Sequence, residues 1–339
     1  MLKQESFTYN STFCFEAGGT LDGMELSYFR SNRPYVKGEK VVWLCHALTG
    51  NANPLDWWPQ MVGEQSPINP HKDYVVCVSM LCSAYGKCGP ASVNPATGKP
   101  YLLDFPKTTI RDMAAANDLV RQHLGIEKID LLIGPSIGGF VAYEWLVMCP
   151  DIFVEADLVA TTFRTPPYMT AFNESQRMAL KLDPTFLAAE SVKGGAQGLE
   201  CARSQALISY RTPEGYNLTQ SEQDQDTLFA DRAASYQRYQ GVKIVRRDFD
   251  AYSYWYLSYA LDSMNIGRGR GGVEEALKSI KAKCRLVSIT TDQLFPPHLG
   301  EYAASVIPDA KHTEIISAFG HDGFLIEHNS LLEALDLKA

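Results

Sequence analysis

The sequence predicts an α/β fold, in which a mostly parallel sheet is covered by helices on both faces and interrupted by one helical insertion. Apolar runs of strand length at 41–45, 74–79 and 129–133 alternate with segments of helical periodicity. Such alternation is typical of parallel strands joined by crossover helices. After a further strand pattern at 156–161, strand signals return only at 285–291, so a long helical segment is inserted between them.

These patterns divide the chain into three parts. We expect 1–165 to form the first part of the sheet domain, 166–280 a mainly helical lid, and 281–339 the rest of the sheet domain. A helical layer with no part in catalysis is the alternative for the insertion. The run GRGRGG at 267–272 follows no strand and lacks the Lys-Ser/Thr pair of a phosphate-binding loop, so we expect a flexible connector there.

Composition and charge exclude several classes of protein. The chain has 339 residues, 45% of them hydrophobic, which is enough to bury a full core. A net charge of −8 argues against a nucleic-acid partner. No apolar stretch approaches the roughly 20 residues of a membrane span, and the lack of an apolar run in the first residues leads us to expect no signal peptide. The 8 cysteines form no Cys-x-x-Cys pair, so we expect reduced thiols, no metal site and a cytoplasmic protein.

The pentapeptide Gly-Pro-Ser-Ile-Gly at 134–138 lies between the strand pattern 129–133 and the helical pattern 140–146. A strand, Gly-x-Ser-x-Gly and a helix in this order are typical of a nucleophile elbow, a tight turn that exposes the serine hydroxyl. Glycines two positions before and after the serine leave the turn the room it needs. The pentapeptide alone arises often by chance, and this context is what makes Ser136 a candidate nucleophile.

Partners for such a serine follow in the expected order, an acid and then a histidine, each after a strand. Asp292 comes directly after the strand pattern 285–291, and His321 follows the short pattern 313–317. The carboxyl ends of parallel strands meet at one edge of a sheet, where catalytic groups collect. Each residue alone could be an ordinary solvated loop residue, but the ordered set predicts a catalytic triad.

The chain also resembles the homoserine O-acetyltransferase family, the α/β-hydrolase-fold acyltransferases of methionine biosynthesis. The resemblance extends from about residue 10 to 330 and is more specific than the serine pentapeptide. It rests on these blocks: CHALTGNANPLDWW (45–58), YGKCGPASVNPATGKPYLLDFPKTTIRDM (85–113), AFNESQR (171–177), ARSQALISYR (202–211), FDAYSYWYLSYALD (249–262), DQLFPP (292–297) and GHDGFLIE (320–327).

The resemblance implies a role for each residue of the candidate triad. Ser136 would be the nucleophile, His321 the general base and acid, and Asp292 the carboxylate that orients the histidine. The oxyanion donors would be the backbone N–H groups of Leu48 and Ile137. The motif itself leads to the same kind of donors, the residue after the serine and one from a loop after an earlier strand.

Binding residues are implied as well. Arg203 in the lid would bind the carboxylate of an amino-acid acceptor, and Asp322 its ammonium group. Tyr210 is a further candidate for this site, with aromatic packing as its alternative. Relatives that use succinyl-CoA resemble one another in an arginine two residues after the triad aspartate, where this chain has Leu294. A leucine would leave the free carboxylate of succinate unpaired, which favours acetyl-CoA as the donor.

The sequence therefore predicts transfer of an acetyl group from acetyl-CoA to the hydroxyl of L-homoserine through an acyl-serine. L-serine as acceptor, succinyl-CoA as donor, a simple esterase or thioesterase, and a non-catalytic binding protein are the alternatives. No cofactor is implied beyond the substrate acetyl-CoA. The resemblance implies a homodimer through the lid helices and a lid that forms the pantetheine tunnel. Pro135 replaces the usual glycine or alanine before the nucleophile, and we expect the fold to tolerate it.

Overall fold

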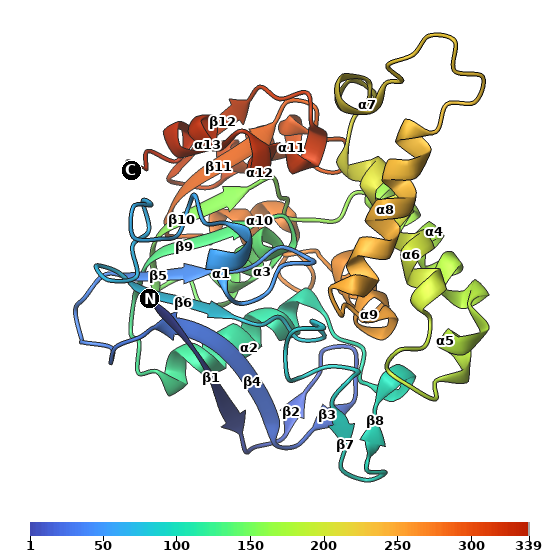
Figure 1. The fold of residues 1–339 in the computed structure, drawn as a ribbon. Coiled ribbons are helices and arrows are strands. Elements are labelled where there is room, and N and C mark those ends of the chain that lie inside the picture. The colour runs from blue at the N-terminus through green and yellow to red at the C-terminus, as the bar shows by residue number, and fades with distance from the viewer. Residues whose placement is uncertain (338–339) are drawn as a thin grey trace.

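An eight-stranded sheet forms the centre of the molecule (Figure 1). The computed structural model describes residues 1–337. Strand β4 is antiparallel to both of its neighbours, β1 and β6, and the strands from β6 to β12 run parallel to one another. In spatial order the strands are β1 (Leu2–Tyr9), β4 (Met24–Ser31), β6 (Tyr74–Val78), β5 (Val41–Leu44), β9 (Ile129–Pro135), β10 (Phe153–Val159), β11 (Lys283–Ile289) and β12 (Ala310–Ile315).

Both faces of this sheet are covered, because alternate residues of the central strands enter two separate apolar clusters. Val41 and Trp43 of β5 belong to the larger cluster, and Val42 and Leu44 to the smaller one. Helices α2, α3, α10 and α11 contribute to the larger cluster, and α12 and α13 to the smaller. The bounds are α1 (Pro54–Trp57), α2 (Ile110–His123), α3 (Ile137–Met148), α10 (Val273–Lys278), α11 (Pro297–Val306), α12 (Gly323–Ile326) and α13 (His328–Ala334). The predicted fold class is confirmed.

Short elements complete the part of the chain before α2. Two small hairpins pair β2 with β3 and β7 with β8, and a 3₁₀ turn, η1, follows the second of them. Their bounds are β2 (Phe13–Cys14), β3 (Thr20–Leu21), β7 (Val93–Asn94), β8 (Lys99–Pro100) and η1 (Leu102–Asp104). A second 3₁₀ turn, η2 (Gly320–Asp322), lies between β12 and α12. No helix within residues 1–337 is both long enough and apolar enough to cross a membrane.

Helices occupy most of the segment between β10 and β11, and we call residues 166–280 the lid. In Figure 1, α4 to α9 lie together to one side of the sheet, with α6 packed between α4 and α8. The bounds are α4 (Pro167–Leu182), α5 (Pro184–Ala188), α6 (Ala196–Tyr210), α7 (Pro213–Gln220), α8 (Arg232–Arg246) and α9 (Ala251–Asp262).

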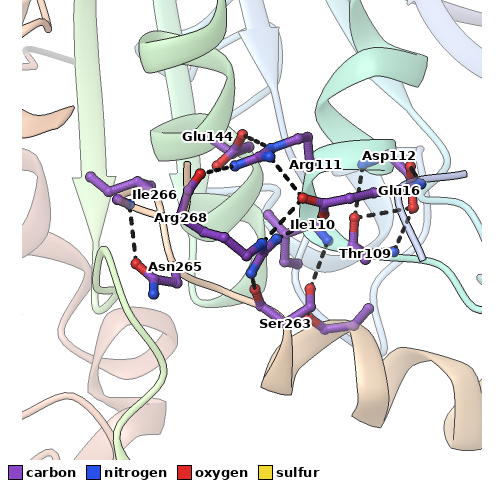
Figure 2. Close-up of polar contacts among 12 residues, drawn as sticks. Glu16, Thr109, Ile110, Arg111, Asp112, Glu144, Ser263, Asn265, Ile266 and Arg268 are labelled. Atoms are coloured by element: carbon purple, nitrogen blue, oxygen red, sulfur yellow. Dashed lines mark hydrogen bonds and ion pairs between the residues drawn. The ribbon is translucent and has the colours of Figure 1, made fainter. Parts of the chain in front are cut away.

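Ion pairs anchor the glycine-rich segment 267–272 near the end of the lid (Figure 2). Arg268 pairs with Glu16 at 2.7 Å, and Arg111 of α2 bridges Glu16 and Glu144 at 2.7 and 2.8 Å. The Glu144 side chain is only 2% exposed, so its charge needs these partners. The connector expected here is thus held against α2 and α3.

Candidate active site

Ser136 occupies the turn between β9 and α3 in a conformation that a side chain rarely adopts. Its φ is 56° and its ψ is −126°, and its N–H donates to the carbonyl of Val159 at 2.9 Å. A positive φ at a residue with a side chain stores strain that the surrounding structure must hold. The turn therefore presents the serine side chain at the end of the strand, as the pentapeptide predicts.

Close backbone contacts explain the glycines of this turn. A Cβ atom on Gly134 would collide with the backbone of Gly138 one turn later. A Cβ atom on Gly138 would collide with the carbonyl group of Cys45, at the end of β5. Both positions require glycine because of this close approach. Pro135, the departure from the family pattern, pairs with Val159 at the end of β9, so the strand accommodates it.

The three residues of the predicted triad form one chain of hydrogen bonds. His321 Nε2 lies 2.9 Å from Ser136 Oγ, and His321 Nδ1 lies 2.7 Å from Asp292 Oδ2. Asp292 follows β11, and His321 lies in η2, after β12. Because the carboxylate accepts from Nδ1–H, Nε2 is left with a lone pair directed at the serine hydroxyl. The histidine is thus placed to accept the serine proton.

The environment of His321 combines burial with negative charge. Its side chain is 5% exposed and packs against the rings of Phe295 and Phe324, with centroids 5.2 and 5.6 Å away. Burial acts to lower the pKa of the imidazole, but the charge and hydrogen bond of Asp292, helped by Asp322, outweigh it and leave the pKa raised. The site therefore stabilises the imidazolium that forms when the serine loses its proton.

Asp292 is itself oriented by the backbone that follows it. Its Oδ1 accepts from the N–H groups of Leu294 and Phe295 at 2.8 and 3.1 Å. The Leu294 side chain is 2% exposed and belongs to the larger apolar cluster. Leu294 thus has a structural contact with the triad that is independent of any donor preference.

The two predicted oxyanion donors come from two different segments near the serine turn. Ile137 begins α3, and Leu48 lies in the loop after β5, which Gly138 contacts through Cys45. Within residues 1–337, neither the Leu48 N–H nor the Ile137 N–H donates to a protein acceptor. Backbone donors kept free in this way can bind the negative oxygen of a tetrahedral intermediate.

His46, which the sequence reasoning missed, holds the loop of Leu48. Its Nε2 accepts from the N–H of Met80 at 3.0 Å, and its Nδ1 contacts the carbonyl of Ala47 at 2.9 Å. Complete burial lowers the pKa of His46 to about 4. The imidazole is therefore neutral and acts as a bridge between two strand ends. A histidine directly after a buried strand is the signal that could have pointed to it.

Arg203 and Tyr210 of α6 approach the histidine from the lid. The Arg203 guanidinium lies 5.3 Å from the centre of the Tyr210 ring, and that ring lies 5.8 Å from the centre of the His321 ring. The structure thus places Tyr210 against the triad histidine and Arg203 beside Tyr210. Packing against the histidine and the arginine accounts for the position of Tyr210.

Asp322 already has a partner in the lid. Its Oδ2 accepts from Arg211 Nε at 2.7 Å, and both side chains are partly buried. The hydroxyl of Thr212 donates to the carbonyl of Ala318 beside this ion pair. Arg211 belongs to the block ARSQALISYR, but a pairing across 111 positions leaves no local signal in the sequence. The predicted ammonium ligand is therefore part of an ion pair that joins the lid to the loop of His321.

Comparisons with known proteins agree with this geometry. The family model of the alpha/beta hydrolase fold matches residues 40–327. Homoserine O-acetyltransferase of Cyclobacterium marinum is 41% identical over 332 residues, which cover 97% of this chain and 93% of that protein. The crystal structure of homoserine O-acetyltransferase from Staphylococcus aureus has a TM-score of 0.80 at 29% identity, covering 100% of this chain and 97% of the other.

A further solved structure shows the fold alone. The crystal structure of esterase E22 superposes with a TM-score of 0.87 at 23% identity, covering 99% of this chain and 100% of that one. The same architecture thus also occurs in a protein named as an esterase. The fold therefore does not identify the family, and the relatives of higher sequence identity to this chain do. On the identity and coverage of those relatives, this chain belongs to the homoserine O-acetyltransferase family of the α/β-hydrolase fold.

Proposed function

We propose that this protein transfers the acetyl group of acetyl-CoA to the hydroxyl of L-homoserine, giving O-acetyl-L-homoserine and CoA. The observation that carries the proposal is the hydrogen-bonded chain from Ser136 through His321 to Asp292, in a chain of this family. A serine activated in this way forms an acyl-enzyme, which separates the reaction into two steps.

In the first step, His321 takes the proton of Ser136 while the serine oxygen attacks the thioester carbonyl. The negative oxygen of the tetrahedral intermediate would accept hydrogen bonds from the N–H groups of Leu48 and Ile137. The carbon–sulfur bond then breaks, CoA leaves with the proton from His321, and an acetyl ester remains on Ser136. Asp292 stabilises the imidazolium during this step.

In the second step, His321 takes the proton of the homoserine hydroxyl, whose oxygen attacks the acetyl ester. The ester bond to Ser136 breaks, and the proton on His321 returns to the serine oxygen. The thioester supplies the activation of the acetyl group, so the two steps require no cofactor. Water is the competing acceptor, and a lid that excludes water favours transfer over hydrolysis.

The acceptor would be held by its two charged groups. Arg203 would bind its carboxylate, and Asp322 its ammonium group, beside the ring of Tyr210. The contact of Tyr210 with His321, the contact of Arg203 with Tyr210 and the effect of Asp322 on the pKa of His321 support this assignment. Since Arg211 occupies Oδ2 of Asp322, the ammonium group would approach Oδ1, which leaves both ions paired.

The donor preference rests on Leu294. We assign acetyl-CoA because an apolar residue at this position provides no partner for the free carboxylate of a succinyl group. The side chain is buried in the apolar cluster beside the triad, and an arginine there would need a counterion. The comparison of acetyl-CoA with succinyl-CoA as donors tests this assignment.

We also propose a homodimer formed through the lid. Large apolar side chains are exposed on the lid helices and their connections, among them Leu182 at 84%, Leu228 at 85% and Phe229 at 83%. A contact with another protein would remove such apolar side chains from water. The free state of all 8 cysteines supports the proposed cytoplasmic location, where thiols stay reduced.

Intact-mass measurement tests the proposed reaction. The protein is mixed with acetyl-CoA alone, and L-homoserine is then added. We expect an acetyl adduct on Ser136 that homoserine discharges into O-acetylhomoserine, and no adduct in Ser136→Ala. Discharge by water at the same rate without homoserine would make the protein a thioesterase, and an adduct from succinyl-CoA alone would overturn the donor assignment.

A further inference from the structure

A small cationic cavity lies beside the candidate active site, between the core and the lid. It has a volume of about 60 Å³, roughly four times the space that one water needs, and three cations line it, Arg203, Lys243 and Arg247. Thr49 and Tyr85 form its wall on the core side. No carboxylate is among the lining residues, all of which lie within the described range 1–337. The cavity therefore has the charge of an anion site.

The charges of these three side chains are not neutralised by carboxylates of the protein within residues 1–337. Within residues 1–337, none of them forms an ion pair, whereas Arg211 and Arg238 of the same lid each pair with an aspartate. Arg203 and Lys243 instead contact the rings of tyrosines, at 5.3 and 5.8 Å from the ring centres. Unpaired cations that share one cavity repel one another, and an anionic ligand would offset this repulsion.

Helix α8 gives an ordinary reason for some of this charge. Lys243 and Arg246 lie in its last turn, where basic residues stabilise the negative end of the helix dipole. Arg246, however, does not line the cavity, whereas Lys243 and Arg247 do, together with Arg203 of α6. The helix dipole therefore does not explain why basic residues from two helices, α6 and α8, line the same cavity.

The cavity is fixed relative to the reacting groups. The Tyr85 hydroxyl donates to the carbonyl of Arg247 at 3.0 Å, which ties the end of α8 to the core loop. Thr49 follows Leu48, the proposed oxyanion donor, and Arg203 contacts Tyr210 next to His321. Arg203 is half-buried, whereas Lys243 and Arg247 are exposed. The cavity thus has Arg203, the neighbour of Tyr210, on one side and two exposed cations on the other.

The number of charges identifies the ligand, given the proposed function. An amino-acid acceptor carries one carboxylate, which a single guanidinium can bind through two hydrogen bonds. Lys243 and Arg247 are then left over. Acetyl-CoA carries a pyrophosphate and a ribose phosphate at the far end of its pantetheine arm, and lysine and arginine are the usual ligands of phosphate. On a protein with a net charge of −8, a local cationic entrance also attracts this anion selectively.

We propose that Lys243 and Arg247 bind the phosphate groups of the acyl donor at the outer end of this cavity. This inference rests on the proposed function for the identity of the donor. It assigns the end of α8 to the nucleotide part of CoA and leaves Arg203 to the acceptor.

Calorimetric titration with CoA and with pantetheine, which lacks the phosphates, tests the proposal without requiring turnover. We expect the wild type to bind CoA more tightly than pantetheine. Lys243→Gln and Arg247→Gln should each weaken CoA binding about tenfold, because each removes a charged hydrogen bond. Pantetheine binding should stay unchanged in both variants, and so should the KM for homoserine.

Arg246→Gln is the matched control, since it removes the same charge from the same helix end and does not line the cavity. Equal CoA affinity in all three variants would overturn the proposal, as would equal weakening of CoA and pantetheine. A raised KM for homoserine with unchanged CoA binding would assign the cavity to the acceptor instead. A wild type that binds CoA but transfers no acetyl group would refute the proposed function and leave the phosphate site standing.

Discussion

Arg211 of the lid and Asp322, the residue after the candidate catalytic histidine, form an ion pair at 2.7 Å. The pair crosses from the lid to the loop that follows β12, and Thr212 bonds to Ala318 beside it. Asp322 also contributes to the raised pKa of His321. Asp322, the residue proposed to bind the acceptor's ammonium group, is therefore positioned by the lid, and its charge affects the pKa of His321.

The Arg211–Asp322 pair leads to a prediction about the acceptor step. Arg211→Gln should raise the KM for homoserine about tenfold, because Asp322 loses the partner that orients its carboxylate. Acetylation of Ser136 by acetyl-CoA should proceed at the wild-type rate, since Asp322 is assigned to the acceptor and not to the acetyl group. Stopped-flow release of CoA and steady-state kinetics separate the two steps. An equal loss in both would show that Arg211 supports the whole site, and Arg211→Lys should restore part of the homoserine affinity.

Removing the charge of Asp322 should move the pH dependence of acylation. The carboxylate favours the protonated form of His321, so Asp322→Asn should lower the pKa of the imidazole. Because acylation needs the neutral imidazole, the acidic limb of the rate profile should shift to lower pH. The burst of CoA release, measured against pH without homoserine, gives this limb directly. A limb that stays in place or moves to higher pH contradicts the coupling.

The strain at Ser136 should be measurable as stability. Ser136→Gly and Ser136→Ala both remove the hydroxyl, but only glycine adopts a φ of 56° with a ψ of −126° at low cost. We expect the glycine variant to be more stable by about 1 kcal/mol in free energy of unfolding. Chemical denaturation of the two variants under the same conditions tests this. Equal stability, or a more stable alanine variant, would mean that the turn holds no such strain.

His46 should make the fold sensitive to mild acid. Its pKa in the folded protein is about 4, below the ordinary value of 6.5, so the unfolded chain binds a proton first as the pH falls. The contribution of neutral His46 to the free energy of unfolding is complete above pH 6.5 and is lost as the pH falls toward 4. At about 1.4 kcal/mol per pKa unit, this loss amounts to roughly 3 kcal/mol.

Two measurements check the role of His46. Unfolding experiments across this pH window should show a smaller loss of stability in His46→Gln than in the wild type. Titration of the His46 imidazole by NMR in the folded protein provides the second measurement, which does not depend on the variant. A midpoint near 6.5 would contradict the buried neutral form.

The proposed dimer should depend on the exposed apolar residues of the lid. Leu182→Asp introduces a charge at a side chain that is 84% exposed, so the fold should tolerate it. A dimer formed there should dissociate, because a buried unpaired charge is costly. Light scattering gives the mass of the wild type and of Leu182→Asp. Val36→Asp, at an apolar residue outside the lid that is 62% exposed, is the control. A wild-type monomer would refute the dimer, and an unchanged dimer in Leu182→Asp would place its contact elsewhere.

Local sequence patterns led to the fold and to the positions of the three triad residues. Ser136, Asp292 and His321 each follow a strand, and parallel strands bring their ends to one edge, so their meeting could be inferred. Arg211 follows no strand, and His46 follows one but makes contacts that the strand pattern does not predict. Their roles depend on which parts of the lid and the loops meet in space, and their sequence neighbours are equally consistent with ordinary surface and core positions.

The ion pairs around Glu16, Arg111, Glu144 and Arg268 have a consequence for engineering (Figure 2). They join the end of the lid to α2, α3 and the region of the N-terminal hairpin. The lid is therefore not an exchangeable module. A chimaera that takes its lid from another member of the fold would leave the buried carboxylate of Glu144 without Arg270, and Glu16 without Arg268, unless the new lid supplies both arginines. A graft therefore has to match core residues that lie far from the lid in sequence.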